Sequence, residues 1–272
     1  MPLSDLMANL WPVLLATAGV AVLAQLITFA VGMRLGRLSV VDITWGAGFA
    51  LIAVVGFVVS MGDGDPLRRW LLAVLTVIWG LRLAIHIGRR QRGEVGEDPR
   101  YEELMSKRKG HPKWAALRSV FLMQAVAAWV ISVPVQVGLV AADRSPAATV
   151  VLLVGVLAWL VGFGFEAVGD YQLERFKAEP DSKGRVLDSG LWRYTRHPNY
   201  FGDACVWWGL FLVALDLPWG LFTIPAPLLM TWLLTAKTGK PMLEAQLTQR
   251  RPGYAEYVSR TSGFLPRPPR RP

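Results

Sequence analysis

Polar side chains gather just before an apolar segment near residue 200. Residues 193–203 read RYTRHPNYFGD, and ACVWWGLFLVAL follows directly. Pro198 suits the first turn of a helix, where its missing N–H removes no hydrogen bond. The free N–H groups of that turn, with the donors of Arg193, Arg196 and His197, favour a phosphate or diphosphate. The alternative is that these arginines only set topology at a membrane edge.

A second polar group precedes this stretch, in GFGFEAVGDYQLERFK. The spacing of Glu166, Asp170 and Lys177 places all three on one face of a helix. Two acids and a base that follow an apolar, Gly-rich run suit hydrogen bonding to a polar ligand. Ordinary ion pairs on a solvated helix end are the alternative.

Asp42 begins an apolar segment, VVDITWGAGF, and shares a helix face with Trp45 and Phe49. Ionisable groups within a membrane span are unfavourable unless they meet a cavity or a partner, so Asp42 is a candidate catalytic acid. An interfacial acid or helix cap close to Arg37 is the other interpretation.

Arg82, His86 and Arg89 follow one another at i, i+4 and i+7, so they share a face that we expect to line the interior of a helix bundle. Histidine titrates near neutral pH, which makes His86 a candidate proton donor. Alternatively, Arg89 extends to the membrane surface and a neighbouring carbonyl satisfies His86.

The composition indicates which elements position these groups. The chain has 272 residues, 53% of them hydrophobic and 18% charged, with a mean hydropathy of +0.36. Such values are typical of an all-α, polytopic membrane protein rather than a soluble domain. The single cysteine, Cys205, excludes an intrachain disulfide. Because no Lys or Arg precedes Arg34, the first apolar run lacks the basic start of a signal peptide and is expected to be a retained helix.

Seven spans are expected: 10–31, 40–60, 70–87, 119–140, 148–170, 201–216 and 218–236. The loops and tail on one side of these spans carry 25 of the 29 Lys and Arg residues. The positive-inside rule then places the N-terminus outside and the C-terminus in the cytoplasm. The net charge of +9 is therefore topological and favours contact with anionic membrane lipids. Nucleic-acid binding is not expected, since the basic residues flank spans and form no separate module.

A single integral-membrane domain is predicted over 1–272, without internal repeats. Residues 1–38 form the first span and turn, 39–265 the core, and 266–272 (PRPPRRP) a Pro/Arg tail expected to be extended or disordered. Within the long loop 88–118, the segment 101–109 is expected to form an amphipathic surface helix.

The stretch LDSGLWRYTRHPNYFGDACVWWG at 187–209 resembles the cofactor motif of the steroid 5-alpha-reductase superfamily, which includes sterol C-14 and delta-7 reductases. The resemblance is greatest to a bacterial branch labelled a domain of unknown function. Supporting stretches are GEDPRYEEL at 96–104, FEAVGDYQLERFK at 165–177 and YAEYVSRTSGFLP at 254–266. The resemblance implies a seven-helix membrane enzyme that binds NADPH in a cavity open to the cytoplasm, in a bacterial inner membrane.

The family reaction is hydride transfer to an activated carbon–carbon double bond, followed by proton delivery. Asp170 matches the family's acid, Asn199 the Asn near the nicotinamide, and Asp203 a nearby Glu. Glu166 and Lys177 stand where the steroid enzymes have Asn and Arg. The residues expected to bind cofactor are Glu166, Asp170, Lys177, Arg193, Tyr194, Arg196, His197, Asn199, Tyr200 and Asp203.

The expected catalytic pair departs from the family pattern. Asp42 and His86 stand where the steroid enzymes have a Glu and a Tyr that orient and protonate the enone oxygen. The expected substrate is therefore a hydrophobic lipid, either steroid-like, isoprenoid or an unsaturated acyl chain. Trp45, Phe49 and Arg82 are expected to line its cavity, and no metal site is predicted.

Two other functions stay open. Isoprenylcysteine carboxyl and phospholipid methyltransferases share an RHPxY motif and bind S-adenosylmethionine, but their tail has paired glutamates. Here KPMLEAQLTQRRPGYAEY has Glu244 alone. A cationic cofactor favours acids, whereas phosphates favour the set of Lys177, Arg193, Arg196 and His197. A non-enzymatic, lipid-binding membrane protein is the third interpretation, and no protein partner is predicted.

Overall fold

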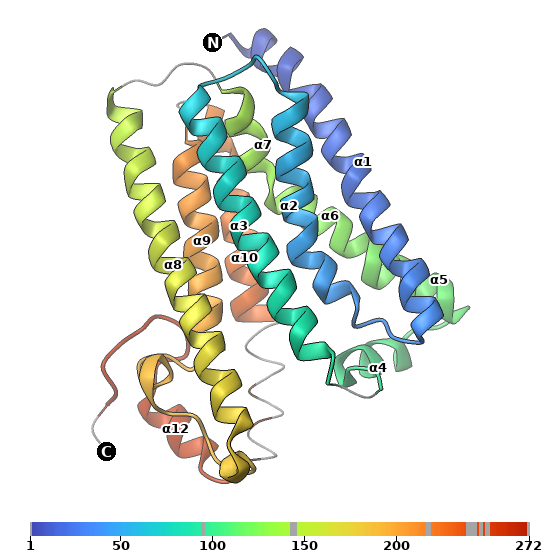
Figure 1. Ribbon diagram of the computed structural model, residues 1–272, viewed down its shortest axis with the longest axis vertical. Helices are drawn as coiled ribbons and strands as arrows, with labels where there is room; N and C mark the ends of the chain where they lie inside the picture. Colours follow the sequence, from blue (N-terminus) through green and yellow to red (C-terminus); the bar gives the residue numbers. More distant parts are fainter. Residues whose placement is uncertain are drawn as a thin grey trace. The chain divides into compact units, whose positions relative to one another are not determined.

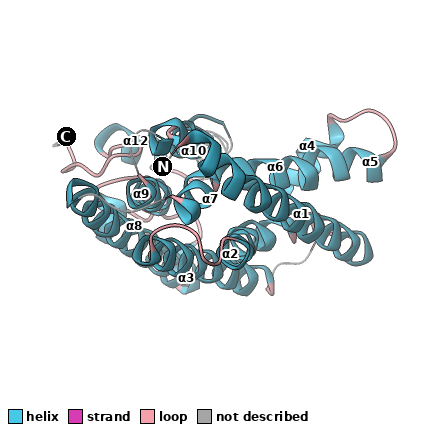
Figure 2. Ribbon diagram, turned by 90° about the horizontal axis from the view of Figure 1, so that it is seen from above, coloured by secondary structure: helices cyan, strands magenta, loops and turns pink. Residues whose placement is uncertain are grey.

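The computed structural model describes residues 2–93, 96–141, 146–215, 219–237, 244, 247 and 251–270. These residues form helices and loops, and Figure 2 shows no strand among them. The chain divides into two compact units. Unit 1 comprises Met1–Leu152 and Val213–Ala226, and unit 2 comprises Leu153–Leu212 and Pro227–Pro272.

Three long helices dominate unit 1 and lie side by side in Figure 1: α1 (Leu3–Leu35), α2 (Val41–Val59) and α3 (Pro66–Gln91). The remaining helical segments of unit 1 are shorter. They are α4 (Pro99–Ser106), α5 (Pro112–Ala116), a π-helical turn (Leu117–Phe121), α6 (Leu122–Ile131), α7 (Val133–Val140) and a 3-10 segment (Trp219–Thr223).

Two helices of unit 1 begin with an Asp-Pro pair. Asp65 accepts a hydrogen bond from the backbone N–H of Arg68 at 2.8 Å, and Asp98 accepts one from Arg100 at 2.8 Å. In each case the proline that follows occupies the first turn, where a free N–H would have no helical acceptor. The start of α4 confirms the helix expected in the loop 88–118, and Tyr101 on α4 is buried.

Glycines bring α2 and α3 into backbone contact. A Cβ atom on Gly46 would lie 2.5 Å from the carbonyl oxygen of Gly80, and one on Gly80 would lie 2.5 Å from that of Gly46. Phe49, three residues after Gly46, and Trp79, directly before Gly80, are fully buried and meet edge to face at 5.5 Å. Small residues at such a crossing permit the dense packing on which helix association in membranes depends.

The span expected over 119–140 is interrupted. The continuous helical stretch runs from Pro112 to Ile131, and α7 begins anew at Val133. Ser132 has a ψ angle of 0°, which departs from helical geometry. Pro134 has no N–H with which to continue the backbone hydrogen bonds of the helix. The interruption therefore follows from the Ser-x-Pro sequence, which the hydropathy pattern did not reveal.

Unit 2 contains residues 153–178 of α8 (Pro146–Ala178), most of α9 (Pro198–Ala214) and α12 (Tyr254–Arg260). It also includes most of α10 (Pro225–Trp232) and the π-helical segment after it (Leu233–Lys237). Two short 3-10 turns, Pro180–Ser182 and Gly190–Arg193, connect α8 to α9. A break between the last two expected spans was predicted at residues 216–220; residues 216–218 lie outside the described residues, and Trp219 and Gly220 begin a 3-10 segment.

Six helical stretches among the described residues are long and apolar enough to cross a membrane, which identifies a membrane-embedded protein: Leu3–Leu35, Val41–Val59, Pro66–Gln91, Pro112–Ile131, Ala147–Ala178 and Trp219–Ala236. The remaining expected span corresponds to α9, which has 17 residues. At 1.5 Å per residue it is about 26 Å long, below the roughly 30 Å of a hydrocarbon core. The structure thus supports six spans and a shorter apolar helix.

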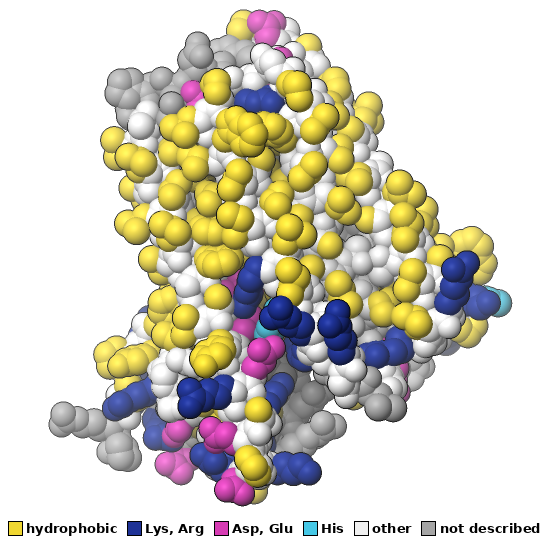
Figure 3. All heavy atoms as spheres, in the orientation of Figure 1, with side chains coloured by type: hydrophobic (Ala, Val, Ile, Leu, Met, Phe, Trp, Pro, Cys, Tyr) yellow, Lys and Arg dark blue, Asp and Glu magenta, His cyan; other side chains and the backbone are white. Residues whose placement is uncertain are grey.

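Exposed apolar side chains cover α8 along most of its length, whereas charged side chains gather at its C-terminal end (Figure 3). A soluble helix would bury such residues, so this stripe is the expected lipid-facing side. Its members are Leu153, Val154, Leu157, Leu160, Val161 and Val168.

Within unit 2, α8 and α9 touch through glycines. A Cβ atom on Gly162 would lie 2.5 Å from the carbonyl oxygen of Gly202, and one on Gly209 would lie 2.7 Å from that of Gly155. Gly169 faces Pro198, whose Cγ would lie 3.1 Å from an added Cβ. The α8 glycines recur every seven residues, about two helical turns, so they form one stripe that faces α9.

We predict that Gly162→Ala destabilises the protein by about 1–3 kcal/mol, because the new methyl group would overlap the backbone of Gly202. Gly164→Ala, on the same helix, is the matched control, since nothing lies within 4 Å of its added Cβ. It should be neutral or stabilise by about 0.5–1 kcal/mol. Thermal unfolding in detergent measures both, and equal unfolding temperatures for the two variants would contradict the close contact.

Candidate functional site

The segment before α9 is fastened to the C-terminal part of unit 2. The Thr195 hydroxyl donates to the carbonyl of Phe264 at 2.8 Å, and the backbone N–H of Arg196 donates to that of Ser262 at 2.9 Å. Thr195 and His197 are almost fully buried. The start of α9 is therefore held by residues about 65 positions later in the chain.

Arg196 uses most of its donors on protein acceptors. Its Nη1 donates to the carbonyls of Val258 at 3.0 Å and Thr261 at 2.6 Å, and its Nε donates to Glu244 at 2.8 Å. A longer contact of 3.4 Å joins Nη2 to the other oxygen of Glu244. Arg196 was expected to bind phosphate, and in the structure it joins three segments of unit 2.

His197 shares the acid of Arg196. Its Nε2 lies 2.9 Å from Oε1 of Glu244, and its ring stacks on that of Tyr200 with centroids 5.2 Å apart and planes 5° apart. Burial raises the pKa of Glu244, but the hydrogen bonds and charges of His197 and Arg196 outweigh this and lower it to about 2. From the sequence, Glu244 was noted only because no second glutamate stands beside it. Its sequence distance of 47 positions from His197 concealed this contact.

The turn of α8 opposite the start of α9 carries the expected acids. Nδ2 of Asn199 donates to Oδ1 of Asp170 at 3.1 Å, and the amide oxygen of Asn199 accepts from the backbone N–H of Tyr200 at 3.0 Å. Glu166, Asp170 and Asp203 are all buried. Gly169 permits this arrangement, since Pro198 and Asn199 lie against its Cα.

We call Glu166, Asp170, Asn199 and Asp203 the α8–α9 polar cluster. Buried carboxylates are retained only where they have partners, and they accept hydrogen bonds strongly. Such a group suits hydroxyl and amide hydrogens of a ligand better than an apolar one. Of the ten expected cofactor-binding residues, the structure joins Asn199 to Asp170 and buries Glu166 and Asp203 one helical turn from them on the same two helices.

The other expected phosphate ligands are arranged differently. Lys177, Arg193 and Tyr194 are exposed on unit 2, whereas Arg196 and His197 are buried against Glu244. These five side chains therefore do not form one cationic group, because two of them are turned to an internal acid. Helical spacing alone did not show where this acid lies.

In unit 1, Asp42 is held by two residues of α4. The Arg100 guanidinium donates to Oδ2 of Asp42 at 2.7 Å, and the Tyr101 hydroxyl donates to Oδ1 at 2.5 Å. Arg100 also binds Asp98 through Nε and Nη2. Burial and the neighbouring Asp42 charge raise the pKa of Tyr101. Arg100 and Tyr101 were not expected at the site, although they lie within the GEDPRYEEL stretch.

The remaining candidates also lie in unit 1. The Trp45 ring meets Phe49 edge to face at 5.1 Å, and Phe49 is fully buried. Arg82 and His86 are partly buried on α3. Their roles in a substrate cavity and in proton donation stay predictions. Among the described residues, no group of three or more His, Cys, Asp or Glu is placed to hold a metal ion.

The lowered pKa of Glu244 gives a pH prediction. Its ionised form stabilises the folded state fully above its ordinary pKa of 4.5, and this contribution is lost as the pH falls through about 2. The unfolding temperature of wild type should therefore exceed that of Glu244→Gln at neutral pH, and the difference should shrink between these values. Glu256→Gln, at an exposed position on α12, is the control. A difference that does not change with pH would contradict the assignment.

Comparison with known proteins identifies the family of this chain. Neither the curated proteins nor the solved structures that were compared include a match to this chain. A family model described as "Protein of unknown function (DUF1295)" matches residues 28–261, which include both the Asp42 contacts and the α8–α9 polar cluster. The chain belongs to the DUF1295 family.

Proposed function

We propose that this protein is a membrane-embedded, NADPH-dependent reductase that transfers hydride to a carbon–carbon double bond of a hydrophobic lipid. The proposal joins the resemblance to the steroid 5-alpha-reductase superfamily with one observation. That observation is the bond between Asn199 and Asp170, beside buried Glu166 and Asp203. Such a set of hydrogen-bonding groups at the end of a membrane helix would be costly without a function.

The α8–α9 polar cluster has the chemistry to hold a nicotinamide ribonucleoside. Asn199 Nδ2 gives one N–H to Asp170 and has a second N–H for a ligand carbonyl. Carboxylates such as Glu166 and Asp203 accept hydrogen bonds from ribose hydroxyls. The stacked pair of His197 and Tyr200 fixes the first turn of α9, which carries Asn199. When bound, NADPH supplies a hydride.

Reduction of a double bond also needs a proton on the second carbon, and unit 1 offers two donors. Tyr101 holds its hydroxyl hydrogen toward Asp42, and Arg100 keeps that carboxylate in place. His86 is the donor expected from sequence, and its imidazole is suited to transfer near neutral pH. We propose that one of these two groups is the proton donor of the reaction and regains its proton from solvent.

The apolar helices and the basic loops also support a proposal for the location of the protein in the cell. The six apolar helices place the chain in a membrane, and the basic loops favour a cytoplasmic position for the α8–α9 polar cluster. We propose the bacterial inner membrane, with a lipid substrate that reaches the site from the bilayer. Membrane lipids of negative charge would contact the basic loops.

A second function has support from one contact. Glu244, ionised and buried against the RHPNY stretch, places an acid where a cationic S-adenosylmethionine would be favoured in a methyltransferase. The acid is, however, already neutralised by Arg196 and His197. Because Glu244 is already paired with Arg196 and His197, it would attract a cationic ligand only weakly. We therefore favour the reductase.

Cofactor binding tests the proposal. The purified protein should be stabilised against heat by NADPH, because a ligand that binds only the folded state raises apparent stability. Asn199→Ala should weaken NADPH binding about ten-fold through loss of a ligand hydrogen bond. Tyr171→Phe, an exposed position on α8, should not. Stabilisation by S-adenosylmethionine with none by NADPH would refute the reductase and favour the methyltransferase.

Two substitutions identify the proton donor. Tyr101→Phe removes the hydroxyl that bonds Asp42, and His86→Phe removes the imidazole. The true donor's variant should bind NADPH as wild type does and lose about 100-fold or more in turnover. Single-turnover oxidation of NADPH with a bacterial lipid extract measures this. Full turnover in both variants would exclude both residues.

A further inference from the structure

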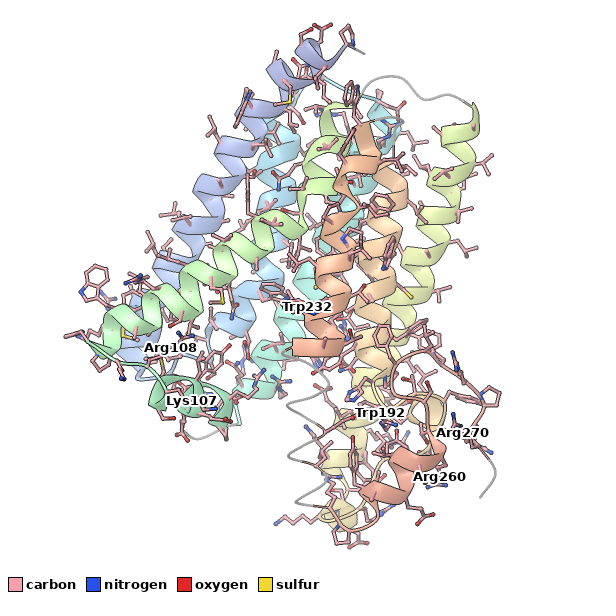
Figure 4. The ribbon with its side chains drawn as sticks, turned by 180° about the vertical axis from the view of Figure 1, so that it is seen from behind. Lys107, Arg108, Trp192, Trp232, Arg260 and Arg270 are labelled. Carbon is pink, nitrogen blue, oxygen red and sulfur yellow. The ribbon has the colours of Figure 1, made fainter. Side chains whose placement is uncertain are left out.

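A cavity of about 290 Å³ lies in unit 2 between the start of α9 and the C-terminal segment. Its walls come from Arg196, from the end of α12 and from residues 267–270. This volume is at the lower limit for ligand pockets, so it suits one polar group of a ligand rather than a whole dinucleotide. Figure 4 shows Arg260 on α12 and Arg270 on the C-terminal segment in this part of unit 2.

Backbone hydrogen bonds hold the walls in place. The N–H of Arg267 donates to the carbonyl of Tyr194 at 3.0 Å, and that of Arg270 donates to Arg260 at 2.9 Å. The tail expected to be extended or disordered is thus extended and fixed as far as residue 270. Arg196 completes the frame through its bond to Thr261. The cavity is therefore a formed feature and not a gap beside a free tail.

Four arginines line this cavity: Arg196, Arg260, Arg267 and Arg270. Two have acid partners, since Arg196 pairs with Glu244 at 2.8 Å and Arg260 with Asp188 at 2.5 Å. Of the ion pairs among the described residues, none includes Arg267 or Arg270. The lining thus carries two exposed guanidinium groups, Arg267 and Arg270, without an acidic partner among the described residues.

A further donor lies at this site. The Nε of Arg260 is buried, and it has no hydrogen-bond acceptor in the part of the chain that the structure describes. Buried donors are nearly always satisfied, so such a group indicates an acceptor from a ligand or ordered solvent. Together with the guanidinium groups of Arg267 and Arg270, it indicates an anion with several acceptor oxygens.

We propose that this cavity, which we call the arginine pocket, binds the phosphate group of a ligand. Planar guanidinium groups match phosphate oxygens in pairs, and Arg267 and Arg270, together with the unsatisfied Nε of Arg260, favour a phosphomonoester or diphosphate over a single carboxylate. Of the residues that form it, Arg196 was expected from sequence to bind cofactor, whereas Arg267 and Arg270 were assigned only to the Pro/Arg tail. The proposal does not rest on the reductase activity, because a lipid headgroup and a nucleotide present the same chemistry.

The test uses the full-length protein in detergent with pyrophosphate as the probe. Pyrophosphate should bind wild type and the control Arg175→Ala, an exposed arginine at the end of α8 outside the pocket. The double variant R267A/R270A should bind about ten-fold more weakly or worse, through loss of charge-assisted hydrogen bonds. R267K/R270K keeps the charge without the paired geometry and should fall between them. Unfolding curves without ligand check that each variant is folded.

Two further arms identify the source of the phosphate. Tighter binding of NADPH than of NADH, lost in R267A/R270A, would assign the ribose 2′-phosphate. Stabilisation in nanodiscs that contain phosphatidic acid over those of phosphatidylcholine alone, lost in the same variant, would assign a lipid headgroup. Equal pyrophosphate affinity in wild type and R267A/R270A, or no binding by wild type, would overturn the proposal. Asn199→Ala should retain pyrophosphate, which separates this site from the α8–α9 polar cluster.

Discussion

The contact between Gly162 and Gly202 is the constraint on which the arrangement of unit 2 depends. An added Cβ on either residue would lie 2.5 Å from the other's carbonyl oxygen, so the two helix backbones touch. This approach continues at Gly169, where α8 meets the first turn of α9. Asn199 can therefore reach Asp170 with its short side chain. Larger residues at these glycines would separate the helices and with them the α8–α9 polar cluster.

Charge compensation is the second feature that both units share. Asp42 at the start of α2 is neutralised by Arg100 of α4, and Arg196 before α9 is neutralised by Glu244. In each unit, a charged residue at the end of an apolar segment forms an ion pair with a residue from a segment outside the spans. Both pairs are partly buried, so removing one member leaves a charge that is only partly compensated by solvent. Arg100 of α4 and Glu244 thus fix the charged residues at these helix ends.

Local patterns predicted the helices well, because hydropathy and proline position are properties of neighbouring residues. The start of α9 at Pro198 was predicted, whereas α3 and α4 begin at Pro66 and Pro99, before the expected residues 70 and 101. Spacing also placed Glu166 and Asp170 on the side of α8 that meets α9. Pairing between distant segments was not predictable in this way. The partners of Arg196, His197 and Asp42 lie between 47 and 65 positions away, and no periodicity encodes such contacts.

The central claim is hydride transfer from NADPH to a membrane lipid. The most direct measurement supplies the purified protein with NADPH deuterated at the nicotinamide C4, S-adenosylmethionine with a labelled methyl group, and a bacterial lipid extract. Mass spectrometry of the lipids then shows which label has moved. The account predicts a lipid that has lost one double bond and gained deuterium, with no labelled methyl group. Labelled methyl in a lipid without deuterium would contradict it.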